Sequence, residues 1–232
     1  MGAIIKLEKN KSNESVFFDN PNIPSNIALQ NLFKEYTNHI RTNEKGIIDE
    51  AEGDFLHDFR VAIRRTRVLL KIARDILPQD AIDSFRKEFT FLAKSTNNER
   101  DREVLLLNKK KYIEMLPKEK QKYLTPFFGA QKKKQNTDIK KLIEHLKSDF
   151  YHDFLNRWNS FVNKVNKIYN DNANQSIIRT ANNKIYNEYN KVIKKQKKLK
   201  LSSKDQKFHD IRIQFKKIRY LMEFFISLYP ER

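Results

Sequence analysis

The 232-residue sequence contains no cysteine, only four glycines and no long apolar run. Without cysteine the chain forms neither disulfides nor thiolate metal sites, and a cytoplasmic location is the default expectation. No apolar stretch approaches the ~20 residues that a membrane span needs, and the N-terminus lacks the apolar core of a signal peptide. Gly2, Gly46, Gly53 and Gly129 lie too far apart for a Walker loop or a dinucleotide-binding fingerprint. Any bound phosphate must therefore be held by side chains and helix N-termini.

The sequence also contains fewer acidic than basic residues. Asp and Glu together number 29 against 47 Lys and Arg, which gives a formal net charge of +18. A chain with such an excess is expected to bind a polyanion. The candidates are nucleic acid, an anionic membrane surface, or a phosphate-rich molecule or polymer.

The spacing of apolar residues predicts an all-α fold. Apolar residues recur at three- and four-residue steps almost throughout, and no Asn-Gly or Asp-Gly hairpin turn occurs. Residues 1–24 are expected to form an N-terminal extension with little structure of its own, and Pro126 could interrupt the fifth helix. The predicted helices cover 25–44, 53–77, 79–97, 100–115, 118–147, 149–170, 174–199 and 205–229.

One segment of the sequence occurs twice. The first copy, HDFRVAIRRTR, begins at His57, and the second, HDIRIQFKKIR, begins at His209. The weaker pair FKEY (33–36) and YNEY (186–189) precedes the copies, so the repeat covers a helix pair. We expect two pseudo-symmetric bundles within residues 25–232, with halves of about 25–125 and 127–232. Because the second copy stops soon after a proline where the first continues, the second bundle is expected to be truncated at the C-terminus.

On a helix, where successive residues turn by ~100°, the basic residues of each copy share one stripe on an otherwise apolar surface. This pattern predicts that both helices are buried except along the stripe. Like charges at this spacing repel one another, so a bound anion is expected to offset the repulsion. The expected anion-binding residues are His57, Arg60, Arg64, Arg67 and Lys71 in the first copy, His209, Arg212, Lys216 and Arg219 in the second, and Arg41 and Lys194, which share a repeat position.

These side chains suit recognition of several phosphates in a row. Arginine offers two parallel donors to a phosphate, lysine a point charge, and a protonated histidine two donors. No residue is required to act as a base or a nucleophile. Arg65 and Lys217 lie off the stripe, on the same side as Asp58 and Asp210, and are expected to form internal ion pairs with them.

The two copies resemble the CHAD domain, the conserved histidine α-helical domain, whose halves carry the pattern His-x-x-Arg-x-x-x-[Arg/Lys]-x-x-Arg. The resemblance covers about residues 25–232 and extends to Arg219-Tyr220, Glu223-Phe224-Phe225 and Arg100-Asp101. It implies two antiparallel bundles of the four-helix type that flank a central basic groove. It also implies binding of long-chain inorganic polyphosphate. A cytoplasmic protein that binds this polymer could associate with polyphosphate granules. No enzymatic activity, cofactor or metal is implied.

Two other functions are compatible with the sequence. The net charge alone would suit a nucleic-acid-binding helical protein, although no recognised binding motif is present. The His-Asp pairs at 57–58, 152–153 and 209–210 would suit a metal-dependent phosphohydrolase of the HD type. Against the second function, arginines beside a proposed cation site would oppose metal binding.

Overall fold

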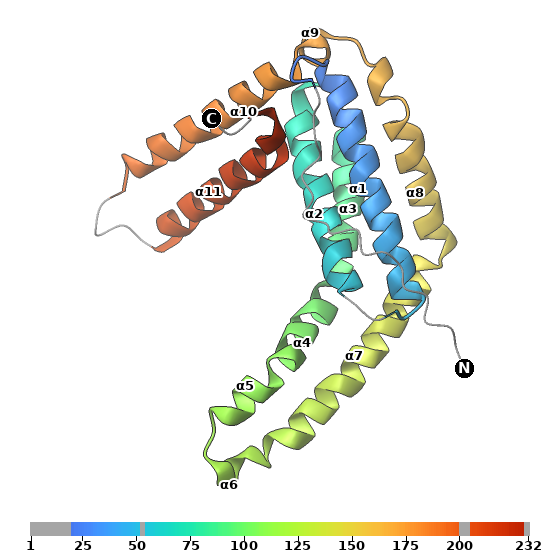
Figure 1. The fold of residues 1–232 in the computed structure, drawn as a ribbon, viewed down its shortest axis with the longest axis vertical. Coiled ribbons are helices and arrows are strands. Elements are labelled where there is room, and N and C mark those ends of the chain that lie inside the picture. Colours follow the sequence, from blue (N-terminus) through green and yellow to red (C-terminus); the bar gives the residue numbers. More distant parts are fainter. Residues whose placement is uncertain (1–19, 52–53, 200–204, 230–232) are drawn as a thin grey trace. The chain divides into compact units, whose positions relative to one another are not determined.

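The computed structural model describes residues 20–51, 54–199 and 205–229, and no β-strand occurs in these ranges (Figure 1). This confirms the predicted all-α fold. Short 3₁₀ turns follow α2, α8 and α11, and no described helix is long and apolar enough to cross a membrane. The helices are α1 (Ser25–Ile48), α2 (Phe55–Ile72), α3 (Gln79–Ser95), α4 (Asn97–Leu107), α5 (Lys109–Glu114), α6 (Lys118–Gln121), α7 (Leu124–Leu146), α8 (Asp149–Val162), α9 (Asp171–Asn174), α10 (Ile177–Gln196) and α11 (Asp205–Phe225).

Several predicted helices are broken in the structure. The segment 118–147 divides into α6 and α7, and Pro126 lies in the first turn of α7, where its missing N–H costs no intrahelical hydrogen bond. The segment 100–115 divides at Asn108, whose side-chain amide donates to the carbonyl of Val104 at 2.8 Å. The segment 149–170 ends as an α-helix at Val162. Local polar contacts and turns thus interrupt helices that were predicted to be longer from the apolar spacing alone.

The chain forms two compact units, each assembled from separate segments. Within the described ranges, the first unit comprises 36–67 and 84–160, and the second comprises 20–35, 68–83 and the residues from 161 onward. Helices α1, α2, α3 and α8 each contribute residues to both units. The division into halves at 25–125 and 127–232 stays a prediction, as does the basic groove.

The core of the first unit is centred on Trp158 of α8, which is fully buried. The rings of Phe85 and Phe89 on α3 meet it edge-on, with centroids 5.1 and 5.0 Å away. Its indole Nε1 donates to Oγ1 of Thr37 on α1 at 2.8 Å. One side chain therefore joins three helices through apolar contact and a satisfied hydrogen bond.

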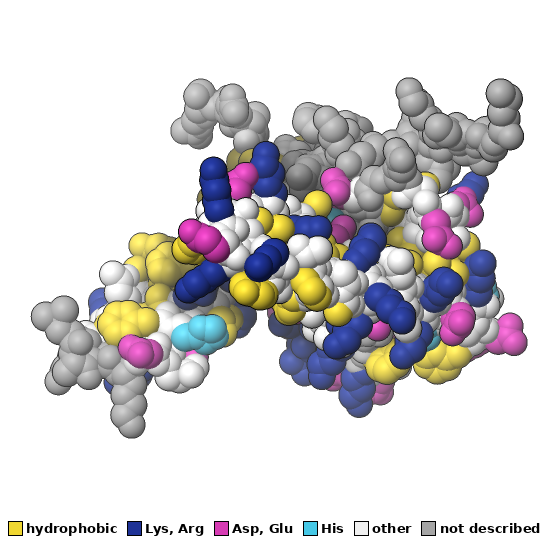
Figure 2. Space-filling view, turned by 90° about the horizontal axis from the view of Figure 1, so that it is seen from below, with side chains coloured by type: hydrophobic (Ala, Val, Ile, Leu, Met, Phe, Trp, Pro, Cys, Tyr) yellow, Lys and Arg dark blue, Asp and Glu magenta, His cyan; other side chains and the backbone are white. Residues whose placement is uncertain are grey.

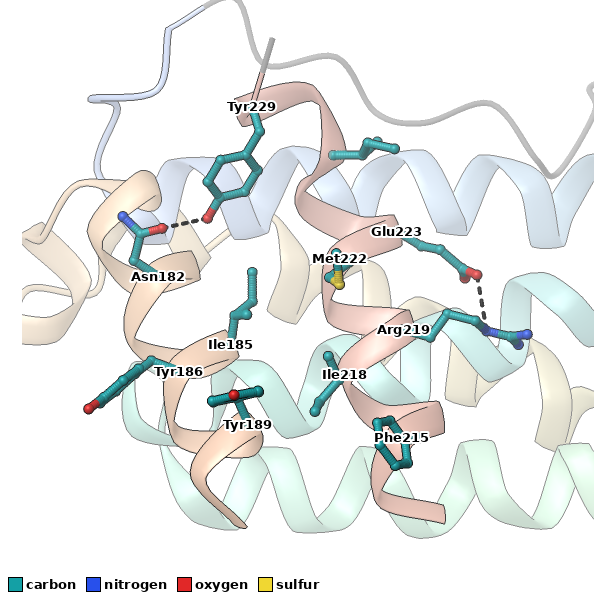
Figure 3. A pocket seen from close by; sticks show the side chains of 11 residues that line it. Asn182, Ile185, Tyr186, Tyr189, Phe215, Ile218, Arg219, Met222, Glu223 and Tyr229 are labelled. Carbon is teal, nitrogen blue, oxygen red and sulfur yellow. Dashed lines mark hydrogen bonds and ion pairs between the residues drawn. The ribbon is translucent and has the colours of Figure 1, made fainter. Parts of the chain in front are cut away.

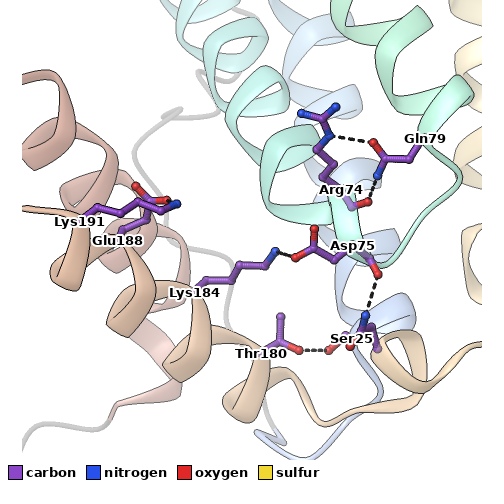
Figure 4. Close-up of polar contacts among 9 residues, drawn as sticks. Ser25, Arg74, Asp75, Gln79, Thr180, Lys184, Glu188 and Lys191 are labelled. Atoms are coloured by element: carbon purple, nitrogen blue, oxygen red, sulfur yellow. Dashed lines mark hydrogen bonds and ion pairs between the residues drawn. The ribbon is translucent and has the colours of Figure 1, made fainter. Parts of the chain in front are cut away.

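In the second unit, the start of α1 is bonded to the start of α10. The hydroxyl of Ser25 donates to the carbonyl of Gln175 at 2.7 Å. It also lies 2.8 Å from the hydroxyl of Thr180, as Figure 4 shows. The backbone N–H of Ile177 donates to the carbonyl of Ile23 at 2.9 Å. Residues 20–24, predicted as the end of the extension, are thus held against α10; residues 1–19 lie outside the described chain.

The two motif helices differ in burial. On α2, the apolar residues Phe59, Ile63 and Leu69 are buried, as predicted. On α11, which forms an antiparallel hairpin with α10 (Figure 1), Phe215 is 54% exposed and Met222 is 55% exposed. The prediction of burial outside the stripe is therefore confirmed for α2. On α11 it holds for Leu221, Phe224 and Phe225, which are buried, and is wrong for Phe215 and Met222.

Candidate functional site

The first stripe, defined as His57, Arg60, Arg64, Arg67 and Lys71, lies on the uninterrupted helix α2. Its three- and four-residue spacing therefore places the five side chains on one face. Arg64 and Lys71 are exposed and the other three are half-buried. The stripe begins two residues after Phe55. The ring of Phe55 lies so close to Gly46 of α1 that a Cβ atom at position 46 would be 2.3 Å from the ring.

Arg60 is bonded to the junction between α3 and α4. Its guanidinium donates to the carbonyl of Ala93 at 3.2 Å, to Oγ1 of Thr96 at 2.5 Å and to Oδ1 of Asn97 at 2.9 Å. Burial lowers the pKa of Arg60, and the nearby carboxylate of Asp101 opposes that shift. Arg60 therefore satisfies the carbonyl of Ala93 at the end of α3, in addition to any contact it makes with a ligand.

Arg67 lies near a second cation from another helix. Burial is the main cause that lowers the pKa of Arg67, and the positive charge of Arg86 on α3 lowers it further. Within the described chain, Arg67 makes no ion pair with an acidic side chain. A second positive charge near a half-buried guanidinium favours the binding of an anion at this position.

Lys71, the last residue of the first stripe, belongs to the second unit and lines a cavity of about 300 Å³ there. Lys184 and Lys191 reach the same cavity from α10 and contact Asp75 and Glu188, as Figure 4 shows. The charged residues that line the cavity are Lys71, Arg74, Lys184, Lys191 and Lys217, with Asp75 and Glu188. The cavity wall is therefore positive overall.

The second stripe, defined as His209, Arg212, Lys216 and Arg219, lies on α11 and is exposed along its whole length. Arg219 pairs with Glu223, with Nε and Oε1 3.2 Å apart. His209, Arg212 and Lys216 have no acidic partner among the residues that the structure describes. Four adjacent donors on one face, three of them without a counter-charge, form a surface that can bind several anionic groups in a row.

Arg41 and Lys194, predicted from their shared repeat position, have different surroundings. Arg41 lies 3.4 Å from the carboxylate of Glu44, which also accepts a hydrogen bond from the hydroxyl of Tyr151 at 2.9 Å. Burial raises the pKa of Glu44, while Tyr151 and Arg41 oppose that shift. Lys194 is exposed on α10 and does not line the positive cavity. Arg41 thus takes part in a partly buried network, whereas Lys194 is a surface cation.

The ion pair predicted between Lys217 and Asp210 is absent from the described residues. Lys217 instead donates to Oε1 of Gln214 at 3.3 Å, and Asp210 accepts a hydrogen bond from Gln206 at 2.8 Å. In the first copy, the guanidinium of Arg65 lies 5.9 Å from the ring centroid of Tyr36, a cation–π contact. Residues three and four apart on α11 therefore bond to each other in place of the predicted pair, whose members are seven residues apart.

The structure adds cations that the repeat did not predict. Lys184 and Lys191 lie seven residues apart on α10, and that spacing is a signal for a shared face. Nothing in the sequence distinguishes Arg86 from other surface cations, because its proximity to Arg67 arises from the packing of α3 against α2. On the face drawn in Figure 2, Lys and Arg side chains are more widespread than Asp and Glu.

The His-Asp pairs do not converge into a ligand set. Within the described ranges, no group of three or more His, Asp or Glu side chains is arranged to hold a metal ion.

Comparison with known proteins identifies relatives of this fold. A crystal structure of the CHAD domain from the plant Ricinus communis superimposes with a TM-score of 0.73 at 20% identity, over 94% of this chain and 71% of that one. PptA from Streptomyces chartreusis superimposes with a TM-score of 0.66 at 11% identity, over 90% of this chain and 77% of that one. No curated protein sequence matches. A family model described as the CHAD domain matches residues 31–232, which contain both stripes. The chain therefore belongs to the CHAD domain family.

Proposed function

We propose that this protein binds long-chain inorganic polyphosphate through its two stripes and does not transform it chemically. The observation that carries the proposal is the second stripe, where His209, Arg212 and Lys216 are exposed without an acidic partner among the described residues. At ~1.5 Å per residue, the stripe from His209 to Arg219 extends over ~15 Å. A polymer of phosphates can contact such a row of donors at several points, whereas one phosphate cannot.

The chemistry of the side chains supports binding without catalysis. Seven of the nine stripe residues are arginine or lysine, which keep their protons at neutral pH and supply charge and hydrogen-bond donors without accepting a proton from a substrate. Arginine can donate two parallel hydrogen bonds to one phosphate. Binding of this kind depends strongly on salt, because the polyanion releases counterions when it binds.

Membership of the CHAD domain family supports the choice of polyphosphate over other polyanions, and the duplication of the motif supports a ligand longer than one stripe. As part of the same proposal, the protein acts in the cytoplasm, in association with polyphosphate granules. Lys71 also lines the positive cavity of the second unit, whose other cations on α10 and α11 are further candidates for contact with phosphate.

Long-chain polyphosphate is expected to displace a fluorescent single-stranded RNA or DNA from the protein when both are present at equal phosphate concentration and equal salt. The reason is that the donors of each stripe are closely spaced. A polymer of phosphates alone can bring more anionic groups to them than a nucleic acid, whose phosphates are separated by sugars. Fluorescence anisotropy measures the displacement. Orthophosphate at the same phosphate concentration and ionic strength is the control for simple screening. Nucleic acid that stays bound in the presence of polyphosphate would contradict the proposal and favour a nucleic-acid-binding function.

A further inference from the structure

The end of the α4–α7 hairpin carries exposed apolar side chains. Residues 107–123, here called the tip, include the short helices α5 and α6, which lie at the end of this hairpin in Figure 1. Among the large hydrophobic side chains of the described chain, four are at least 70% exposed. Three of the four, Leu107, Met115 and Tyr123, lie on the tip. Such a concentration of exposed apolar side chains is typical of a surface that contacts a protein or a membrane.

The tip is folded and is joined to the rest of the hairpin. The side-chain amide of Gln121 donates to the carbonyl of Leu116 at 3.1 Å, which links α6 to the turn that precedes it. The ammonium group of Lys109 lies 5.8 Å from the ring centroid of Phe128 on α7, a cation–π contact. These contacts stabilise the conformation in which the three apolar side chains are exposed.

The tip is also strongly basic. It carries six lysines, all of them exposed, against two glutamates, which gives a net charge of +4. Lys110 lies 3.9 Å from Glu114, and the other lysines have no acidic partner within the described chain. The six are Lys109, Lys110, Lys111, Lys118, Lys120 and Lys122. The tip therefore complements a surface that is negatively charged and that accepts apolar side chains.

The three apolar side chains belong to separate elements. Leu107 is the last residue of α4, Met115 follows α5 and Tyr123 precedes α7. By contrast, the apolar side chains of α10 and α11 lie together around a cavity of about 980 Å³, as Figure 3 shows. A cavity suits a partner of fixed shape, whereas separate side chains at the end of a hairpin suit a fluid layer that each of them can enter on its own.

An anionic lipid bilayer matches both the apolar and the basic side chains of the tip. Lysines can contact lipid phosphates while their methylene groups lie along the apolar region, and tyrosine prefers the boundary between headgroups and acyl chains. Leucine and methionine gain free energy when they leave water for that boundary. Inorganic polyphosphate and nucleic-acid phosphates would contact the lysines and leave Leu107 and Met115 in water.

We propose that the tip binds the surface of an anionic membrane, with its three exposed apolar side chains inserted among the lipid headgroups and its lysines in contact with the lipid phosphates. The contact is confined to the surface, because no described helix is long and apolar enough to cross a membrane. The cytoplasmic leaflet of a cell membrane carries anionic lipids, so the contact is compatible with the proposed location of the protein. The tip shares no residue with either stripe.

Co-sedimentation of the full protein with lipid vesicles, free of polyphosphate and nucleic acid, tests the proposal. We expect binding to vesicles of phosphatidylcholine and phosphatidylserine in a ratio of about two to one, and little binding to phosphatidylcholine alone. In Met115→Ser with Tyr123→Ser, the loss of two inserted side chains is expected to weaken binding at least ~10-fold. The matched control, Met222→Ser with Tyr169→Ser, changes the same residue types at exposed positions outside the tip and is expected to bind as the wild-type protein does.

A second pair of variants tests the role of the lysines. We expect Lys118→Gln with Lys122→Gln to weaken binding at least ~10-fold, because each lysine near an anionic membrane contributes several-fold. Lys133→Gln with Lys134→Gln removes the same charge from α7, about ten residues or ~15 Å along the hairpin, where salt screens its effect. Absence of binding by the wild-type protein, or equal weakening by a tip variant and its control, would overturn the proposal.

A fluorophore on the tip distinguishes insertion from adsorption by charge alone. The chain has no cysteine, so Met115→Cys and Tyr169→Cys each introduce one site for a label whose emission shifts to shorter wavelength in an apolar environment. We expect this shift at position 115 when phosphatidylserine vesicles are added, and none at position 169. Vesicle binding without the shift, or a shift with RNA and not with vesicles, would overturn the proposal. Because no polyphosphate is present, failure of this proposal is distinguishable from failure of the proposed function.

Discussion

Replacement of Arg212 and Lys216 by glutamine weakens the binding of long-chain polyphosphate by about 100-fold, if the second stripe holds the ligand. Both side chains are exposed and have no acidic partner in the described chain, so they are available to phosphate. A hydrogen bond to a charged group contributes about 1.5 kcal/mol or more, and the loss of two corresponds to this factor. Isothermal titration calorimetry at fixed salt measures the change.

The matched control for this variant is Lys133→Gln with Lys134→Gln. These lysines are exposed on α7 and their replacement removes the same charge from another surface. We expect a change of only a few fold. Equal weakening by the two double variants would show that net charge, and not the stripe, determines binding. Arg60 is less suitable for this comparison, because its hydrogen bonds to Ala93 and Thr96 join α2 to the end of α3.

Replacement of Trp158 by alanine is expected to lower the free energy of unfolding by about 3–5 kcal/mol. The indole is fully buried between Phe85 and Phe89, and its Nε1 is bonded to Thr37. Its removal leaves a cavity among three helices and breaks that hydrogen bond. Chemical denaturation followed by circular dichroism measures the loss of stability.

Phe150→Ala is the control for this substitution, because Phe150 lies on the same helix and is 63% exposed. A surface substitution of this kind changes stability by about 0.5 kcal/mol. If Trp158→Ala cost no more than Phe150→Ala, the assignment of Trp158 to the centre of the core would be wrong.

The helices were largely predictable because their apolar periodicity is strong. Helices α1, α3 and α11 start within a residue or two of the expected positions. The interruptions were less predictable. Proline at position 126 suggested a break at that residue, but proline is well tolerated in the first turn of a helix, and the break lies before Leu124.

The arrangement of the candidate site residues could be predicted from the sequence only where it depends on a single helix. A wheel places the first stripe on one face of α2, since α2 is continuous. It could not show that Arg60 donates to Ala93, because that contact depends on how α3 packs beside α2. The proximity of Arg67 and Arg86 has the same origin.

The helical wheel also failed to predict the exposure of Phe215 and Met222 on α11. It shows which side chains share a face, but not whether another helix covers that face. The sequence of α11 is as apolar outside its stripe as that of α2, yet Phe215 and Met222 are exposed where their counterparts Ile63 and Leu70 are buried. The two copies differ in which other helices pack against them. An alignment of the repeat does not show this packing.

Calorimetric titration with orthophosphate, tripolyphosphate and long-chain polyphosphate, at equal total phosphate and fixed salt, tests the central claim most directly. Because the second stripe extends over ~15 Å, a longer polymer can contact more of its donors at once. We expect the affinity per phosphate to rise from orthophosphate to tripolyphosphate and again to the long chain. Equal affinity per phosphate for all three would contradict recognition of a phosphate polymer by the stripes.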